Sequence, residues 1–473
     1  MSEKAPFSMV IDGQLVAAET SLEVIDPATG KAFAKAPNCS RIQLDAAVES
    51  STLAFEWWRK TDISVRRAAL LDIARIMEAN TGELSSLLTR EQGKPLTDAA
   101  GEIAIAVARL RGTAKLTLPE AVEEPTPGRR VRIVRTPLGV VGAIAPWNFP
   151  ISLAIQKVAS ALLAGNTVVL KPSPTTPLTT LRIGELVHRL LPPGVLNIVS
   201  GADPLGQWMT QHGGIAKISF TGSIETGRRV MASAASDLKR VTLELGGNDA
   251  AIVFPGVDVP AVAEKLFWAA FRNAGQICIA AKRIYVHADI YDAFRDALVV
   301  YARQIKVGNG AEPGVQIGPV QNLQQFRRIA GLIAECASEG HKFALGGFAP
   351  PEDGGYFLPL TIVDNPPDEA RLVTEEQFGP IVPLLRFTDT EDVVRRVNAT
   401  RFGLAASVWS PDADFASSLA ERIDSGTVWI NEVQLLSAGV PFGGHKQSGI
   451  GVEGGQEGLL EYTNAKVMTL VTG

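Results

Sequence analysis

The chain has 473 residues, of which 46% are hydrophobic and 20% charged, and its formal net charge is −5. The composition is ordinary for a globular protein, and the length exceeds what one hydrophobic core usually serves, so we expect two or more domains. The mild acidic balance and the lack of a dense run of lysines and arginines argue against nucleic acid or an anionic membrane as a partner.

Three cysteines, Cys39, Cys278 and Cys336, are odd in number and far apart in the sequence. This spacing favours a reducing compartment over a disulfide framework, and nothing in it supports a zinc or other metal site. The first residues lack a basic region followed by an apolar core, and no apolar run reaches about 18 residues. We therefore expect a cytoplasmic protein without a membrane span.

In chain order, the sequence first predicts a hairpin and then a layer of helices. Asp12-Gly13 lies between short apolar runs, as in a two-residue hairpin turn. From Ile42 to about Arg111 apolar residues recur at helical spacing. The alternating segment 131–135 indicates a half-exposed ribbon, which is either a solvated edge or an arm that meets another subunit.

After Gly139 the pattern changes to short apolar strands that alternate with helices, in two series. This pattern predicts two doubly wound α/β lobes with parallel sheets, whose ligands bind beyond the carboxyl ends of the strands. The predicted strands are 140–145, 167–170, 194–199, 216–220 and 241–245 in the first series, and 251–254, 283–287, 381–386 and 427–431 in the second, with helices over 291–304 and 323–337.

Two glycine patterns compete for a dinucleotide. The segment 449–454 matches GxGxxG, but it follows no predicted strand and too little chain remains for a βαβ unit, so we interpret it as a loop. The segment 220–227 instead follows a predicted strand and begins a helix, where backbone N–H groups could hold a phosphate. Lys171 lies just past another strand end and is either a cofactor contact or an ordinary solvated lysine.

Cys278 follows Asn-Ala-Gly-Gln, a small and polar turn inside an apolar segment. Such a cysteine is either a packed core thiol or a nucleophile. A thiol with a pKa of about 8.5 is only slightly ionised at neutral pH, so a nucleophile here needs a base or a cationic environment. The sequence has no His-x-x-x-His pair and no Gly-x-Ser-x-Gly motif, which leaves metal-dependent and serine-dependent hydrolysis without their residues.

Two polar residues near predicted strand ends are candidate partners for Cys278. Glu244 lies between Leu243 and Leu245, where partial desolvation would raise its pKa toward that of a general base; it is otherwise a capping or salt-bridged glutamate. Asn148 follows the strand 140–145 between aromatic residues and prolines. Its amide suits an oxyanion site, or else it caps the helix that begins near Ile151.

Seven motifs in this order resemble those of the aldehyde dehydrogenase superfamily along nearly the full length of the chain. They are Pro146-Trp147-Asn148-Phe149-Pro150, Lys171-Pro172-Ser173, Phe220-Thr221-Gly222-Ser223, Glu244-Leu245-Gly246-Gly247, Asn273 to Cys278, Glu375-Glu376-Gln377-Phe378-Gly379-Pro380, and Pro441 to Gly449. The resemblance implies a Rossmann-like NAD(P)-binding domain over 1–117 and 138–246, a catalytic domain over 247–447, and a β oligomerisation arm over 118–137 and 448–473. It also implies a homodimer, or a homotetramer built from two dimers.

By this resemblance, Cys278 is the nucleophile, Glu244 the base, Asn148 the oxyanion donor, and Lys157 a lysine that helps to tune the base. Cysteine attack on an aldehyde gives a thiohemiacetal, which can donate hydride where the free aldehyde cannot. The thioester that follows is hydrolysed by water activated by the glutamate. The cofactor contacts implied are Trp147, Lys171, Ser173, Gly222, Ser223, Leu245, Glu376 and Phe378.

The sequence departs from the family pattern at three positions. Pro174 replaces an acidic residue that holds ribose hydroxyls in many NAD-using members, so NAD is favoured with NADP still possible. Gln456 is interpreted as standing where some members have a proton-relaying glutamate, which would leave Glu244 without that partner. Val452 stands where arginine is usual, and we attach no functional consequence to it.

The residues expected around the mouth of the substrate pocket are mostly aliphatic, and with Phe149 they point to an aliphatic or arylalkyl aldehyde of moderate size: Leu153, Gln156, Arg272, Leu435 and Leu436. Arg272 could instead attract an acidic semialdehyde, or simply face solvent or a carboxylate. Two further alternatives are a CoA-acylating dehydrogenase, a branch that generally lacks the glutamate base, and a catalytically silent structural or binding protein. The presence of both Cys278 and Glu244 argues against these two.

Overall fold

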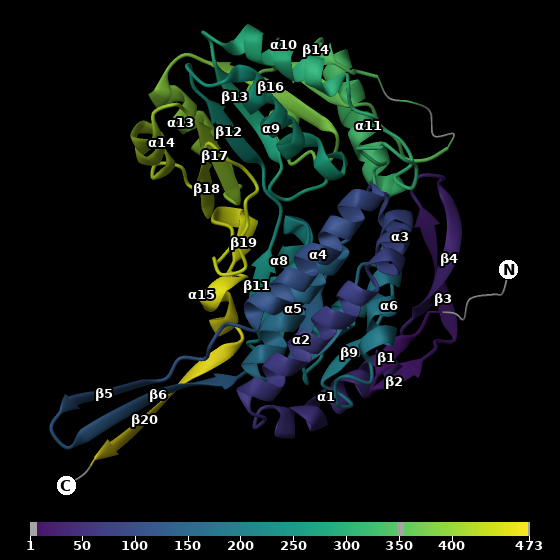
Figure 1. Ribbon diagram of the computed structural model, residues 1–473, viewed down its shortest axis with the longest axis vertical. Helices are drawn as coiled ribbons and strands as arrows, with labels where there is room; N and C mark the ends of the chain where they lie inside the picture. Colours follow the sequence, from purple (N-terminus) through teal and green to yellow (C-terminus); the bar gives the residue numbers. More distant parts are fainter. Residues whose placement is uncertain (1–6, 349, 351–353, 472–473) are drawn as a thin grey trace.

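The computed structural model describes residues 7–348, 350 and 354–471, which form two α/β lobes and a projecting ribbon (Figure 1). The first lobe is built on an eight-stranded sheet in the order β19-β11-β10-β7-β8-β9-β1-β2. Strands β7 to β11 are parallel to their neighbours, whereas β1 and β19 run antiparallel. These strands are β1 (Met9–Ile11), β2 (Gln14–Val16), β7 (Val140–Ile144), β8 (Thr167–Lys171), β9 (Leu196–Ile198), β10 (Lys217–Thr221), β11 (Arg240–Glu244) and β19 (Gly449–Ile450).

The central strands of this first sheet are buried because helices cover both of its faces, as in most parallel sheets. The predicted helical layer is confirmed as four helices, and the predicted hairpin as β1–β2. A separate two-stranded sheet joins β3 (Thr20–Asp26) to β4 (Lys31–Asn38). The helices are α1 (Arg41–Trp58), α2 (Ile63–Ala79), α3 (Thr81–Gln92), α4 (Leu96–Thr113), α5 (Pro150–Ala164), α6 (Leu178–Val187), α7 (Leu205–Gln211), α8 (Ile224–Ala235) and α15 (Gly455–Leu460).

The second lobe has a seven-stranded sheet in the order β14-β15-β16-β13-β12-β17-β18, parallel except where β14 meets β15. Its strands are β12 (Asp249–Val253), β13 (Ala281–His287), β14 (Lys342–Leu345), β15 (Thr361–Asp364), β16 (Ile381–Phe387), β17 (Ala405–Trp409) and β18 (Thr427–Ile430). Its helices are α9 (Val259–Phe271), α10 (Tyr291–Ala302), α11 (Leu323–Ser338), α12 (Arg371–Thr374), α13 (Thr390–Asn398) and α14 (Ala413–Ala420), with short 3₁₀ turns η1 (Arg272–Gly275) and η2 (Lys446–Ser448). The predicted fold class, two doubly wound α/β lobes, is confirmed.

The ribbon projects away from both lobes at the lower left of Figure 1. It is a three-stranded antiparallel sheet of β5 (Ala121–Thr126), β6 (Arg129–Pro137) and β20 (Thr463–Val471). The carboxyl-terminal range expected for this arm is too wide, because β19 pairs with β11 and α15 packs on α5, both in the first lobe. Residues 1–6 and 472–473 of the predicted ranges lie outside the described residues.

None of the described helices is both long and apolar enough to cross a membrane. The GxGxxG segment that we interpreted as a loop begins with the two-residue strand β19, which follows the turn η2 and pairs with Leu243 and Glu244. It therefore joins the edge of the first sheet as an antiparallel strand and is not the turn of a parallel βαβ unit, which a dinucleotide needs.

Candidate active site

The candidate site lies where the chain passes from the first sheet to the second. Strand β11 ends at Glu244, and Leu245 to Asn248 connect it to β12 of the other lobe. Cys278 follows α9 and the turn η1, just before β13 begins. Glu244 thus lies at the carboxyl end of β11, which is the end where such a sheet binds its ligand, and Cys278 comes from the second lobe. The base and the nucleophile therefore meet at the junction of the lobes.

The turn before Cys278 has an unusual backbone. Asn273, Ala274 and Gly275 have φ values of 54°, 55° and 71°, which is the left-handed region. A Cβ on Gly275 would lie 2.2 Å from the carbonyl oxygen of Gly379, so only glycine fits there. Two non-glycine residues in this region cost free energy, which the surrounding hydrogen bonds must offset.

Asn148 is tied directly to this turn. Its side-chain Nδ2 donates to the backbone carbonyl oxygen of Gln276 at 3.0 Å. Its backbone carbonyl oxygen accepts from Asn273 Nδ2 at 3.1 Å and from Lys94 Nζ at 3.0 Å. Within the described residues only one of its two side-chain N–H groups is used, so the other can face an oxyanion.

The alternative that Asn148 caps α5 is wrong. The helix begins at Pro150 without a side-chain cap from a preceding residue. The Oε1 atom of Glu102 instead accepts hydrogen bonds from the backbone N–H groups of Ile151 and Ser152, at 2.8 and 3.1 Å. Glu102 forms a buried ion pair with Lys94, so one pair of charged side chains holds both the start of α5 and the backbone of Asn148.

Glu244 is buried at the end of β11, and its Oε1 has no hydrogen-bond partner among the described residues. The capping or salt-bridged alternative is therefore not supported. Burial and the charge of Glu453 raise the pKa of Glu244 well above its ordinary value, while the charge of Lys157 opposes the rise. A buried carboxyl group with such a pKa suits a general base, as its position in the sequence suggested.

The interpretation of Gln456 is wrong. Its side chain donates to the carbonyl oxygen of Thr117 at the surface, away from the base. The carboxylate beside Glu244 is Glu453, which pairs with Lys157 and accepts from Ser219 Oγ at 3.1 Å. Nothing in the local sequence identified Glu453, because only the path of the chain after β19 brings it to α5 and β10.

The Cys278 side chain is half-buried. Burial raises the pKa of its thiol to about 12, and the charge of Lys282 opposes that rise. Lys282 Nζ also donates to the backbone carbonyl of Cys278 at 2.6 Å. The free protein therefore holds this cysteine as a thiol, and its ionisation requires a base or an added positive charge.

A cleft of about 380 Å³, partly open to solvent, leads to Cys278. Eight predicted residues line it: Trp147, Asn148, Gly222, Ser223, Leu245, Cys278, Glu376 and Phe378. Sequence reasoning missed four others, Gln325, Arg328, Arg401 and Phe402. The indole of Trp147 and the ring of Phe378 meet edge to face at 5.3 Å, so the cleft has an aromatic wall.

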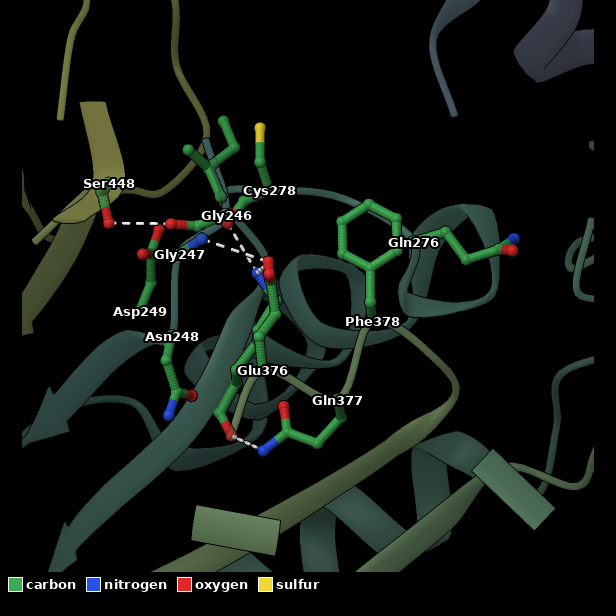
Figure 2. Close-up of polar contacts among 12 residues, drawn as sticks. Gly246, Gly247, Asn248, Asp249, Gln276, Cys278, Glu376, Gln377, Phe378 and Ser448 are labelled. Atoms are coloured by element: carbon green, nitrogen blue, oxygen red, sulfur yellow. Dashed lines mark hydrogen bonds and ion pairs between the residues drawn. The ribbon is translucent and has the colours of Figure 1, made fainter. Parts of the chain in front are cut away.

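Figure 2 shows how the glycine pair after Leu245 is held. Ser448 Oγ donates to the carbonyl oxygen of Gly246 at 2.7 Å, and the N–H of Gly247 donates to Glu376 Oε1 at 3.1 Å. A Cβ on Gly246 would lie 2.0 Å from Glu376 Oε2, so glycine permits this close approach. The sulfur of Cys278 points away from Glu376.

The cleft also contains a helix start with phosphate-binding character. Strand β10 ends at Thr221, and α8 begins at Ile224 with Ser223 as its N-cap, accepting from the N–H of Thr226. The free N–H groups and the dipole of such a helix start favour an anion. Lys171 and Ser173 do not line this cleft; they are buried at the end of the next strand but one, where burial lowers the pKa of Lys171 to about 8.

The residues expected around the substrate are dispersed. Phe149 and Cys278 pack against one hydrophobic cluster, which includes Ile277 and Ile279, whereas Leu435 and Leu436 are exposed. Arg272 is exposed too, over the ring of Trp268, and its charge acts on Asp98. Leu153 and Gln156 are half-buried on α5. Sequence reasoning missed Trp429 and Phe442, which pack against the same hydrophobic cluster as Phe149 and Cys278, so this cluster has more aromatic neighbours than we expected.

A profile described as the aldehyde dehydrogenase family matches residues 15–468. The chain belongs to the aldehyde dehydrogenase family. It is 44% identical to a "Probable aldehyde dehydrogenase" from Pseudomonas sp., with 99% of this chain and 96% of that protein covered. It is 39% identical to a "Probable succinate-semialdehyde dehydrogenase [NADP(+)]" from Sinorhizobium fredii, with 94% and 92% covered.

The fold of this chain agrees with solved structures of the family. The structure of betaine aldehyde dehydrogenase from Staphylococcus aureus, in complex with NAD+, has a TM-score of 0.95 and 32% identity, with 98% of this chain and 95% of that chain covered. The prediction of an NAD(P)-dependent aldehyde dehydrogenase, an oxidoreductase that acts on small-molecule aldehydes, is thereby confirmed.

Proposed function

We propose that this aldehyde dehydrogenase oxidises its aldehyde to the carboxylic acid through a covalent intermediate on Cys278. The sulfur attacks the aldehyde carbon, and the free N–H of Asn148 with the backbone N–H of Cys278 stabilises the oxyanion. NAD(P) held in the cleft would supply the hydride acceptor, and loss of hydride from the resulting thiohemiacetal leaves a thioester on Cys278. Glu244 takes a proton from water, which attacks the thioester and releases the acid and the cysteine. The observation that supports this most is the unpartnered, buried carboxyl of Glu244 at the lobe junction.

The cleft fits an NAD(P) molecule. The start of α8 at Ser223 suits the pyrophosphate, Trp147 and Phe378 offer apolar walls for the nicotinamide, and Glu376 can accept from ribose hydroxyls. We propose Lys171 and Ser173 as contacts of the adenosine half. On this scheme the segments 1–117 and 138–246 bind the cofactor and 247–447 supplies the nucleophile, with Pro174 leaving NAD favoured and NADP possible.

We propose Lys157 as a residue that tunes Glu244, because its charge opposes the rise in the base's pKa. The substrate is an aliphatic or arylalkyl aldehyde, since Phe149, Trp429 and Phe442 pack against the same hydrophobic cluster as Cys278. A semialdehyde is the second candidate, and it is favoured by the 39% identity to a relative whose name gives succinate semialdehyde. Leu153, Gln156, Arg272, Leu435 and Leu436 remain the proposed outer contacts.

The ribbon of β5, β6 and β20 supports the proposal of a homodimer or homotetramer. It projects from the lobes, and Val467 and Leu470 on β20 are exposed apolar side chains. Light scattering that finds a monomer would contradict this. The three free cysteines fit a cytoplasmic location, which cell fractionation can test.

The function is tested by mixing the protein with a panel of aliphatic and arylalkyl aldehydes and either NAD or NADP, without CoA. We expect reduced cofactor to form with at least one pair. Cys278→Ala should abolish oxidation but keep cofactor binding, because the cleft is formed by other residues. Full activity in Cys278→Ala, or turnover only when CoA is added, is the result that overturns the proposal.

A further inference from the structure

Lys282, the second residue of β13, places a buried ammonium group directly behind the wall of the cleft. Its side chain is only 3% exposed, and it does not line the cleft itself. Its Nζ donates to the backbone carbonyl of Cys278 at 2.6 Å, and it lies 3.3 Å from Glu376 Oε1 and 5.8 Å from the centre of the Phe378 ring. All three of these neighbours line the cleft. One charged group therefore links the nucleophile to residues proposed to hold the cofactor.

The contact with Lys282 fixes one oxygen of the Glu376 carboxylate. Oε1 also accepts from the N–H of Gly247 at 3.1 Å, so two donors hold this oxygen. Within the described residues no donor is hydrogen-bonded to Oε2, which lies against Gly246. Glu376 and Gly246 both line the cleft, and Figure 2 shows the carboxylate beside the glycine pair. The carboxylate is therefore held with Oε2 available to a hydroxyl group in the cleft.

A second carboxylate, that of Asp249 at the start of β12, helps to hold the ammonium in place. A Cβ on Gly247 would lie 2.6 Å from Asp249 Oδ1 and 2.8 Å from the carbonyl oxygen of Cys278, so these two oxygens are close neighbours. Burial raises the pKa of Asp249 to about 7, and the charge of Lys282 opposes that rise. A buried ammonium needs such partners, because desolvation of a lone charge is costly. The position of the ammonium is therefore set by two carboxylates and the backbone of the nucleophile.

The same ammonium acts on the Cys278 thiol. Burial raises the pKa of this thiol, and the charge of Lys282 opposes the rise. The charge of Glu376 acts in the opposite direction, so its ion pair with Lys282 offsets part of the effect of the lysine. The ionisable groups that face the thiol come from both lobes: Lys282, Asp249 and Glu376 from the second, and Glu244 and Arg109 from the first.

We propose that Lys282 is a positioning residue, which holds Glu376 ready for the ribose of the cofactor and fixes the backbone of Cys278 relative to it. This inference rests on the proposed function and adds a residue to it. Because Oε1 is held by Lys282 and Gly247, Oε2 can accept from a ribose hydroxyl without a prior change of side-chain orientation. The other contact of the ammonium holds the nucleophile. Cofactor affinity and thiol reactivity therefore depend on one side chain outside the cleft.

The first test is cofactor binding, measured by calorimetry without aldehyde, with whichever of NAD and NADP the wild-type protein binds more tightly. Lys282→Met should raise Kd about 10-fold, because a hydrogen bond to a charged group contributes that much. Because Lys282 acts through Glu376, Lys282→Met should weaken binding little further in a Glu376→Ala background. Lys342→Met, a change of an exposed lysine in the same sheet, is the control. An unchanged Kd in Lys282→Met, or fully additive losses in the double variant, overturns the inference.

The second test is alkylation of Cys278 by iodoacetamide without cofactor, followed by peptide mass spectrometry at mildly alkaline pH. Only the thiolate reacts, so Lys282→Met should slow the reaction about 3- to 10-fold, and Glu376→Gln should speed it, because a negative charge is lost. Alkylation of the buried Cys39 and Cys336 would reveal an unfolded variant. A rate that does not fall in Lys282→Met, or does not rise in Glu376→Gln, contradicts the inference. If Lys282→Met does not fold, Glu376→Gln still decides it.

The two proposals fail differently. If neither cofactor binds and no aldehyde is oxidised, the proposed function fails. If an aldehyde is oxidised in a reaction that needs Cys278, but Lys282→Met binds the cofactor and reacts with iodoacetamide as the wild type does, the function stands and only the role of Lys282 fails.

Discussion

Glu244 has to satisfy two opposing demands. It must be unprotonated to take a proton from water, yet its burial and the neighbouring Glu453 favour the protonated form. The charge of Lys157 moderates this effect, and Lys157 is itself held by Glu453. Below the raised pKa the base is protonated and thioester hydrolysis stops, so activity should fall as pH decreases through that value.

Removal of the neighbouring charge should move this pH dependence. In Glu453→Gln the pKa of Glu244 is lowered, because one negative charge is lost and Lys157 is left without its carboxylate. The acidic limb of the thioester-hydrolysis rate, measured in single turnovers, should shift to lower pH. Glu461→Gln is the control, because Glu461 lies near Lys217 but its charge has no resolved effect on Glu244. A profile that stays in place, or moves to higher pH, shows that Glu453 does not set the base.

At the scale of elements, the site depends on how α4 and α5 are joined. Lys94 precedes α4, and its buried ammonium contacts Glu102, the carbonyl of Asn148 and the ring of Phe149, 4.0 Å from its centroid. The start of α5 takes its cap from Glu102 on α4 and not from its own sequence. One ion pair thus fixes the first half of α4 relative to the beginning of α5.

Loss of this ion pair should affect both stability and catalysis. Lys94→Met leaves Glu102 buried without a partner, which costs about 3–5 kcal/mol of folding free energy. We expect a lower Tm in thermal unfolding and slower oxidation, since Asn148 loses a hydrogen bond. Lys60→Met, a change of an exposed lysine, is the control. A Tm equal to that of Lys60→Met would show that the pair does not anchor the helices.

The sequence predicted the strands and their ends well but not the contacts between distant segments. Glu244 and Asn148 were found because buried parallel strands read as apolar runs that end in polar residues. Glu453 was missed because it follows a short edge strand and a glycine-rich turn, which have no periodicity. The alternative that Asn148 caps α5 arose because local sequence favours a local cap, whereas a glutamate from another helix supplies it.

At the scale of the whole molecule, each lobe supplies part of the reaction. The first sheet supplies Glu244, Asn148 and the helix start at Ser223, and the second lobe supplies Cys278, Glu376 and Phe378. Glu244 ends β11 of the first lobe and Cys278 precedes β13 of the second, so the base and the nucleophile lie on separate elements. A change of Glu244 alone should therefore block thioester hydrolysis and leave hydride transfer in place.

The most direct measurement is rapid-mixing kinetics of Glu244→Gln with an aldehyde and cofactor. The account predicts a burst of reduced cofactor close to one per active site, followed by little turnover, with a thioester on Cys278 detectable by mass spectrometry. Sustained turnover at the wild-type rate would contradict the assignment of Glu244 as the base, and so would the absence of any burst in a folded variant that still binds the cofactor.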